Sequence, residues 1–242
     1  MRVRRIHILA AVVFVAVCCT PAGGPARRDW PQPAGWTGPG QVPPPQRMKL
    51  WFGGDVMQHM PQVEAARCGE RFDYRPVFAA LAPRMRAADL TVVNLETTLN
   101  GRYTGYPLFR SPVALADALR DAGVDVAVLA NNHCCDGGAE GIRTTVVELD
   151  RCGILHTGVF ADSADYKKNN PLYLNRCGMR LAIVNYTYGT NGMPVPAGTI
   201  VNLIDTVRMA ADLAEARASG VDFIVACLHW GNEYERRENA GQ

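Results

Sequence analysis

The sequence predicts a layered α/β domain with a mostly parallel or mixed sheet. Two observations support this prediction. Short apolar runs rich in β-branched residues recur along the chain from Met48 onward. Amphipathic segments of helical period lie between these runs, and glycine or an acidic capping residue stands at several of their ends. Buried strands that alternate with surface helices are typical of α/β folds.

Five apolar runs are predicted to be strands. Each is short and almost free of polar residues, as expected for a strand that is buried on both faces of its sheet. The runs are Leu50–Phe52, Leu90–Leu95, Val124–Ala130, Leu181–Val184 and Phe223–Leu228. A minor strand is predicted at Ile154–Leu155, and His156, which follows it, is interpreted as structural.

Three segments between these runs are predicted to be helices. They are Val113–Ala122, Ala139–Arg151 and Thr206–Ser219. The second carries its apolar residues on one face and ends before Gly153, as an amphipathic helix with a glycine after its last turn does. The third follows Asp205, a candidate N-cap, and stops at Gly220.

Residues 1–20 are predicted to be an export signal that lies outside the fold. Met1–Arg5 carries three arginines, and Ile6–Val17 is almost wholly apolar but too short to span a bilayer. Cys18 and Cys19 follow directly, so two outcomes stay open: plain cleavage, or lipid attachment to a cysteine as in a bacterial lipoprotein. Both predict an exported protein in the periplasm or at the cell surface, and the second adds a lipid anchor to the membrane.

The segment after the signal is predicted to be a tether. Residues 21–47 hold eight of the sixteen prolines and several glycines, a composition that cannot build a core. The folded domain is therefore assigned to residues 48–242. The net charge of +2 gives no strong electrostatic field, so we expect no nucleic-acid partner.

Side chains that bind metal ions stand where the predicted strands end. The groups are Asp55 and His59 after the first strand, Asn94 and Glu96 at the second, Asn131, Asn132, His133 and Asp136 after the third, and His229 and Glu233 after the last. Ligands of open α/β sheets bind beyond the carboxyl ends of the strands, so we expect these groups to meet along one edge of one sheet. Carboxylate, amide and imidazole groups from separate strands form a ligand set for one or two divalent ions.

Four stretches carry these groups in motifs of specific spacing. They are Gly54–Met57, Val92–Glu96, Asn131–His133 with Asp136, and Leu228–Gly231 with Glu233–Tyr234. Together they resemble the CapA-type capsule (poly-γ-glutamate) synthesis proteins, whose domain belongs to the calcineurin-like metallophosphoesterase superfamily. Tyr186–Gly192 resembles a further signature of one branch. The resemblance implies a metallo-dependent phosphatase-like α/β sandwich.

The resemblance also implies a role for each matching residue. The metal ligands would be Asp55, Glu96, Asn132 and His229, with Glu96 the nearest equivalent of a bridging carboxylate. His133 would protonate the leaving group, and Asp136 is assigned to the same catalytic motif. Substrate binding is assigned to His59, Asn94, Asn131 and Glu233. The cofactors implied are divalent ions, one or two of Mn, Fe, Zn or Mg.

Two features of the superfamily have no match in this sequence. Met57 stands where the first motif has a histidine, and the final Gly-His-x-His motif is missing. Only fourteen residues follow Leu228. We therefore expect the C-terminal part of the domain to be missing, and the complete protein to hold metal more readily than this chain.

Three functions stay open at this point. The first is a metal-dependent hydrolase of a phosphoester, in the biosynthesis or export of a capsule or envelope polymer of the poly-γ-glutamate type. The second is a non-catalytic subunit that binds the anionic polymer, with Arg102, Arg110 and the 103–107 loop as candidate contacts, or that assembles with subunits of a membrane synthesis complex. The third is a thiol-dependent hydrolase that uses Cys134 or Cys135 as nucleophile and His133 as base.

Overall fold

The structure is a computed structural model that describes residues 16–19, 47–233, 235, 237–240 and 242. The predicted signal and tether lie outside the described residues, except for Ala16–Cys19, which forms strand β1, and Arg47. Among the described residues, no helix has the length and apolar character needed to cross a membrane.

The strands form two main sheets. The first has the order β2-β5-β8-β9 and is wholly parallel. Its strands are β2 (Leu50–Val56), β5 (Leu90–Leu95), β8 (Val126–Val128) and β9 (Leu155–Thr157). The second has the order β1-β14-β12-β11, in which only the β12–β14 pair is parallel. Its strands are β1, β11 (Leu172–Arg176), β12 (Met179–Thr187) and β14 (Phe223–His229).

Apolar side chains from both sheets fill the space between them. They are Leu90, Val92, Val126 and Val128 of the first sheet, and Leu172, Leu174, Leu181, Ile183, Val225 and Cys227 of the second. The neighbouring residues Val93 and Leu95 of β5 belong instead to the cluster under the helices. Successive side chains of a strand point to opposite faces, so a strand between two apolar layers is buried throughout, as all six residues of β5 are.

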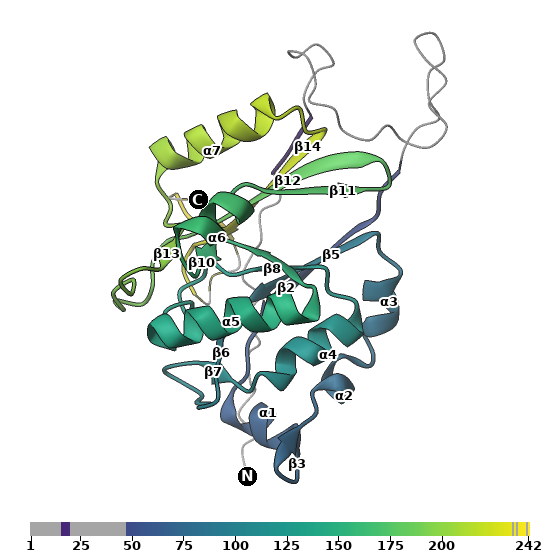
Figure 1. The fold of residues 1–242 in the computed structure, drawn as a ribbon, viewed down its shortest axis with the longest axis vertical. Helices are drawn as coiled ribbons and strands as arrows, with labels where there is room; N and C mark the ends of the chain where they lie inside the picture. Colours follow the sequence, from purple (N-terminus) through teal and green to yellow (C-terminus); the bar gives the residue numbers. More distant parts are fainter. Residues whose placement is uncertain (1–15, 20–46, 234, 236, 241) are drawn as a thin grey trace.

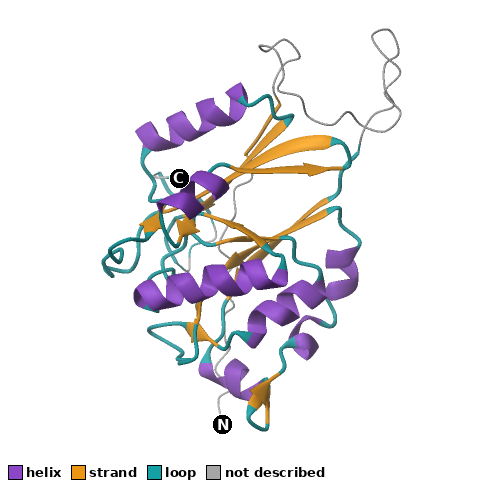
Figure 2. Cartoon of the chain, in the orientation of Figure 1, coloured by secondary structure: helices purple, strands orange, loops and turns teal. Residues whose placement is uncertain are grey.

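Helices cover the outer face of each sheet, as Figures 1 and 2 show. Helices α4 (Ala114–Ala122) and α5 (Gly138–Cys152) contribute to the core cluster of the first sheet. Helix α7 (Thr206–Ala218) packs through Ala216 on the second sheet. The molecule is thus a four-layer sandwich of helices, sheet, sheet and helix.

The predicted α/β sandwich is confirmed, and so are the five main strands and the three helices. The Asp205 side chain caps α7 by accepting hydrogen bonds from the backbone N–H groups of Val207 and Arg208, at 2.9 and 3.3 Å. One expectation was wrong: the strand that ends in His229 does not share a sheet with the other three site strands. The apolar pattern shows that a strand is buried on both faces, but it does not show which sheet covers it.

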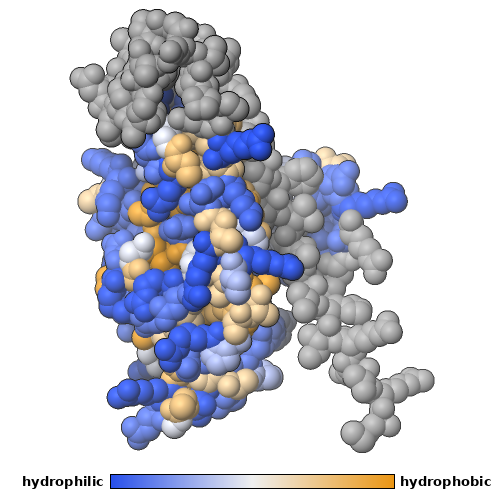
Figure 3. Space-filling model, turned by 90° about the vertical axis from the view of Figure 1, so that its right-hand side faces the viewer, coloured by the Kyte–Doolittle hydropathy of each residue, from blue (hydrophilic) through white to orange (hydrophobic). Residues whose placement is uncertain are grey.

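Shorter elements complete the described part of the chain. The helices are α1 (Met60–Ala65), α2 (Arg75–Phe78), α3 (Ala82–Arg86) and α6 (Ser163–Asn169). The strands are β3 (Arg67–Cys68), β4 (Arg71–Phe72), β6 (Thr98–Leu99), β7 (Arg110–Ser111), β10 (Val159–Phe160) and β13 (Ile200–Val201). Figure 3 shows one face of the molecule, on which polar residues lie over much of the surface with apolar residues between them.

Candidate metal centre

Side chains from both sheets meet at the carboxyl ends of β2, β5, β8 and β14. One donor atom each of Asp55, Glu96 and His229 lie within 4.8 Å of one another. Asn132 joins this group, because its Oδ1 accepts a hydrogen bond from His229 Nε2 at 3.0 Å. The structure therefore brings together all four predicted metal ligands, although His229 comes from the second sheet.

A β-bulge carries Asp55 into this group. Phe52 pairs with Val92 and Asp55 with Asn94, so β2 has one residue more than β5 between these pairs. A Cβ atom on Gly53 would lie 2.7 Å from the Trp51 ring, which leaves no room for a side chain there. Bulges change the direction of neighbouring side chains and are frequent beside active sites. Asp55 thus lies within β2, and not after the strand as the sequence predicted.

Asn94 holds the two carboxylates in place. Its Nδ2 donates to Asp55 Oδ1 at 2.8 Å and to Glu96 Oε2 at 3.1 Å. Its Oδ1 accepts from Asn131 Nδ2 at 3.1 Å, and Asn131 Oδ1 accepts from the backbone N–H of His133. Both asparagines are buried and their amides are engaged within the site. They hold the proposed ligands in position, and their predicted role in substrate binding stays a prediction.

The electrostatics of the group favour a bound cation. Burial and the neighbouring Asp55 carboxylate raise the pKa of Glu96 to about 9, because a second buried negative charge is costly there. Burial lowers the pKa of His229, which keeps its imidazole neutral and able to coordinate a metal ion. A divalent ion would offset the repulsion between the carboxylates. Two carboxylates, an amide oxygen and an imidazole nitrogen fit such an ion.

His133 and Asp136 form a pair beside the ligands. His133 Nδ1 lies 2.7 Å from Asp136 Oδ2, which also accepts from the backbone N–H of Phe109 at 2.6 Å. Arg110 Nε donates to the backbone carbonyl of Asp136 at 2.8 Å. Asp136 is buried and orients the imidazole. Its predicted assignment to the catalytic motif stays a prediction. His133 Nε2 faces Asn191, whose Nδ2 is 3.4 Å away.

His59 and Glu233 lie outside the ligand group. His59 is exposed and contacts the Phe109 ring edge-on, with ring centroids 4.8 Å apart. His133 contacts the same ring, with centroids 4.7 Å apart. Glu233 is exposed, and its charge is near enough to contribute to the raised pKa of Glu96. Substrate contact by either residue stays a prediction.

The geometry does not support the thiol-hydrolase interpretation. Cys134 and Cys135 are buried, with their sulfur atoms 3.9 Å apart. The hydrogen bond to Cys135, together with burial, raises the pKa of the Cys134 thiol, which makes it a poor nucleophile. The same hydrogen bond lowers the pKa of the Cys135 thiol, so for Cys135 the position of His133 decides. The ring nitrogens of His133 face Asp136 and Asn191. His133 is therefore not placed as the base of a cysteine nucleophile.

Sequence reasoning assigned no role to three residues that build the site. Tyr188 stacks on His229 with ring centroids 6.0 Å apart, and Asn191 contacts Asn132 and His133. The signature Tyr186–Gly192 marked both as noteworthy without saying what they contact. Asn185 joins the two sheets: its Oδ1 accepts from Ala130 N at 2.6 Å, and its Nδ2 donates to Cys227 O at 3.2 Å. Its position directly after the apolar run Leu181–Val184 was the only signal for it.

The two-sheet architecture and this ligand group define a metallophosphoesterase-like domain with a candidate metal centre. Residues 49–242 match the family described as bacterial capsule synthesis protein PGA_cap, so the chain belongs to that family and the CapA-type resemblance is confirmed. It is 23% identical over 211 residues to capsule biosynthesis protein CapA of Bacillus anthracis, covering 81% of this chain and 50% of that protein.

Two further relatives are similar to parts of the chain. PGA biosynthesis protein CapA of Bacillus subtilis (strain 168) is 24% identical over 198 residues, covering 79% of this chain and 51% of that protein. Uncharacterized protein y4sH of Sinorhizobium fredii is 35% identical over 95 residues, covering 36% of this chain and 21% of that protein. The chain thus spans about half the length of the two CapA proteins that it matches.

Proposed function

We propose that this chain is part of a protein for the biosynthesis or export of a capsule or envelope polymer, and that its domain is a metal-dependent phosphoesterase-like hydrolase. The observation that carries the proposal is the cluster of Asp55, Glu96 and His229 beside the His133–Asp136 pair. The names of the two CapA relatives support the capsule role. An anionic polymer of the poly-γ-glutamate type or a phosphoester intermediate is the proposed substrate class.

In this proposal the metal is held by Asp55, Glu96, Asn132 and His229. A bound divalent ion supplies Lewis acidity and makes water a stronger nucleophile near neutral pH. His133 gives a proton to the leaving group from Nε2, while Asp136 keeps Nδ1 occupied and so fixes the ring. Asn94 holds the two carboxylates next to each other through its Nδ2 group.

The ligand count supports one ion more than two. Among the described residues, Asp55, Glu96 and His229 are the only group of three or more His, Cys, Asp or Glu side chains close enough to share an ion. Met57 occupies the position at which the superfamily has a further histidine. We therefore propose a single divalent ion, Mn, Fe, Zn or Mg, for this chain.

The proposal is tested by metal content and turnover on the same samples. Purified chain is incubated with Mn²⁺ and desalted, and bound metal and hydrolysis of bis(p-nitrophenyl) phosphate are measured. We expect close to one ion per chain and metal-dependent hydrolysis. His133→Ala should keep the ion and lose turnover at least about 100-fold, as loss of a general acid does. Wild-type chain without bound metal, or unchanged turnover in His133→Ala, contradicts the proposal.

A non-catalytic polymer-binding role is the second candidate. It is favoured by the loop around residues 102–107, in which Arg102 is exposed and Tyr106 is 80% exposed. The loop leads into Phe109 and Arg110, which both bind Asp136. This role predicts that the chain binds poly-γ-glutamate without hydrolysing the phosphodiester. Arg102→Ala should weaken that binding, whereas Arg84→Ala on α3, which is also exposed, should not.

We also propose that the protein is exported, on the basis of the composition of residues 1–20 alone. In this proposal the domain works at the periplasmic or cell-surface side of the membrane, near the subunits of a synthesis complex. Cell fractionation with mass analysis of the mature N-terminus tests export, and it also separates plain cleavage from lipid attachment at Cys18 or Cys19. Recovery of the uncleaved protein from the cytoplasm would contradict it.

A further inference from the structure

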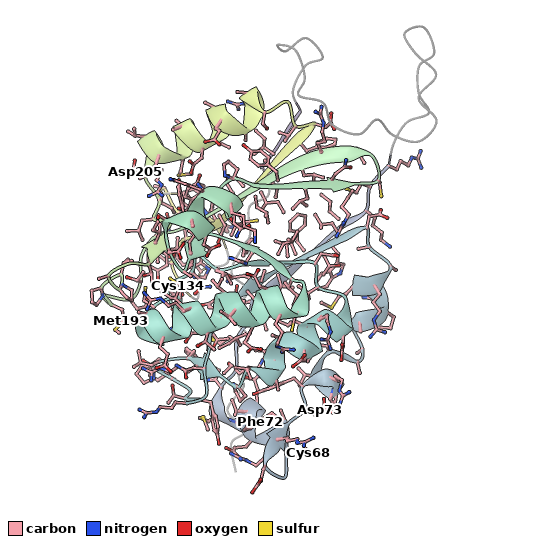
Figure 4. The ribbon with its side chains drawn as sticks, in the orientation of Figure 1. Cys68, Phe72, Asp73, Cys134, Met193 and Asp205 are labelled. Carbon is pink, nitrogen blue, oxygen red and sulfur yellow. The ribbon has the colours of Figure 1, made fainter. Side chains whose placement is uncertain are left out.

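The loop that follows β12 lies against the metal centre. Tyr188 stacks on His229 at an interplanar angle of 14°, and Asn191 contacts the Asn131–His133 turn. Met193 of the same loop, labelled in Figure 4, packs on the core cluster of the first sheet. A tight turn closes the loop, because Met193 N donates to Thr190 O at 2.9 Å and Thr190 Oγ1 to Met193 O at 2.6 Å. The loop is thus anchored on both sides of Asn191.

The backbone fixes the direction of the Asn191 side chain. Its φ is 51°, in the left-handed region, which asparagine tolerates better than most residues do. From this position its Oδ1 accepts a hydrogen bond from Asn132 Nδ2 at 3.3 Å. Its Nδ2 faces His133 Nε2 at 3.4 Å. One amide therefore contacts both a proposed metal ligand and the proposed general acid.

The contact with Asn132 decides which end of that amide faces the metal pocket. Only the oxygen of a side-chain amide can coordinate a cation, and the NH₂ group cannot. Asn191 Oδ1 is an acceptor, so the Asn132 NH₂ group must point to it. Asn132 Oδ1 then points to the other side, where it accepts from His229 Nε2 at 3.0 Å.

We propose that Asn191 is a positioning residue that orients Asn132 with its oxygen toward the metal. The inference rests on the proposed function for the identity of the metal ligands. Groups behind the ligands commonly set the orientation and affinity of a metal site. Asn191 acts through Asn132, and the Tyr186–Gly192 signature thus contacts the centre through both Asn191 and Tyr188.

The left-handed backbone of Asn191 allows a clean deletion of its side chain. Asn191→Gly removes the amide without a backbone penalty, because glycine adopts positive φ freely. Asn191→Asp keeps an acceptor for Asn132 Nδ2 and removes the NH₂ group that faces His133 Nε2. Cys177→Gly is the matched control: Cys177 has a φ of 52°, is exposed, and lies in the turn between β11 and β12.

The experiment measures Mn²⁺ affinity by calorimetry for the wild-type chain and the three variants. We expect Asn191→Gly to bind about 10- to 100-fold more weakly, the usual loss for such a residue. Asn191→Asp should restore the affinity to within a few-fold of wild type, and Cys177→Gly should match wild type. Equal affinity of Asn191→Gly and wild type would overturn the inference. Equal losses in Asn191→Gly and Asn191→Asp would also overturn it, because they would show that only the shape of the loop matters.

A second measurement separates this inference from the proposed function. In the metal-free protein, NMR reports the Asn132 side-chain NH₂ group and the rate at which its protons exchange with water. We expect slow exchange in wild type and Cys177→Gly, and faster exchange in Asn191→Gly. If wild type binds no Mn²⁺, the proposed function fails, and the exchange rates still decide the orientation of Asn132. Identical rates in wild type and Asn191→Gly would overturn the inference.

Discussion

His229 Nε2 donates to Asn132 Oδ1 across 3.0 Å, although the two residues are 97 positions apart in the sequence. His229 ends β14 of the second sheet, and Asn132 lies in the turn that follows β8 of the first. Through this contact the second sheet contributes a side chain to the ligand group. The centre therefore depends on how the two sheets pack and not on one sheet edge alone. Changes to the inter-sheet contacts should affect metal binding as strongly as changes to some of the ligands.

Replacement of Glu96 should separate stability from metal binding. Glu96→Gln keeps the shape of the side chain and, because burial and Asp55 favour the neutral form of Glu96, it should leave the metal-free melting temperature close to wild type. At a Mn²⁺ concentration 100 times the Kd, the free energy of unfolding of wild type should rise by about 2.7 kcal/mol. That of Glu96→Gln should rise little. Thermal unfolding with and without Mn²⁺ measures both. Glu140→Gln, an exposed residue of α5, is the control and should behave as wild type.

The pH dependence of stability follows from the same residue. The pKa of Glu96 is about 9 in the folded chain, against an ordinary value of 4.5. Between these values the folded chain holds a proton that the unfolded chain lacks, so the free energy of unfolding falls as the pH rises. This group alone contributes a slope of roughly 1 kcal/mol per pH unit. Denaturant unfolding of metal-free wild type and Glu96→Gln at several pH values measures it, and equal slopes in the two proteins would exclude this role.

Two adjacent glycines of β2 should differ in their tolerance of a side chain. Gly53→Ala places a Cβ 2.7 Å from the Trp51 ring and 3.1 Å from Val93 Cγ1. We expect the free energy of unfolding to fall by about 1–3 kcal/mol, as for other overpacked sites. Mn²⁺ binding should also weaken, because the change displaces Asp55. Gly54→Ala meets no atom within 4 Å and is the matched control. Similar stabilities of the two variants would contradict the importance of the bulge.

Asn185 should contribute to stability through both sheets. Asn185→Ala leaves the backbone N–H of Ala130 and the carbonyl of Cys227 without their side-chain partner. An unpaired buried polar group costs about 1–3 kcal/mol, so the variant should unfold at clearly lower denaturant concentration. Asn175→Ala on β11, which is exposed, should change the midpoint little. A midpoint for Asn185→Ala equal to that of Asn175→Ala would show that the link between the sheets carries no free energy.

The sequence predicted the strands, the helices and the gathering of polar residues at the strand ends for a physical reason. Strands such as β5 are apolar on both faces, and polar residues follow their ends. The sequence pattern therefore indicates both the strand and the point where it ends. The interpretation of His156 as a structural histidine agrees with its contacts. It is buried, and its Nε2 lies 3.0 Å from Asp165 Oδ1.

Other features could not be predicted from the sequence, because they depend on contacts between residues that are far apart in the chain. The assignment of β14 to a second sheet needs the hydrogen-bonding partner of the strand, which apolar periodicity does not encode. The buried roles of Asn94 and Asn131 need the neighbours of their amides. Asn191 lies in a loop without periodicity, so its contact with Asn132 could come only from the structure.

Anomalous diffraction from crystals of this chain grown with Mn²⁺ tests the central claim most directly. We predict one strong peak in bonding contact with Asp55, Glu96, Asn132 and His229. The matching crystals of Asp55→Asn should show the peak weakened or lost. Wild-type crystals without a peak at these residues, or with the ion bound elsewhere, would contradict a metal centre at the meeting point of the two sheets.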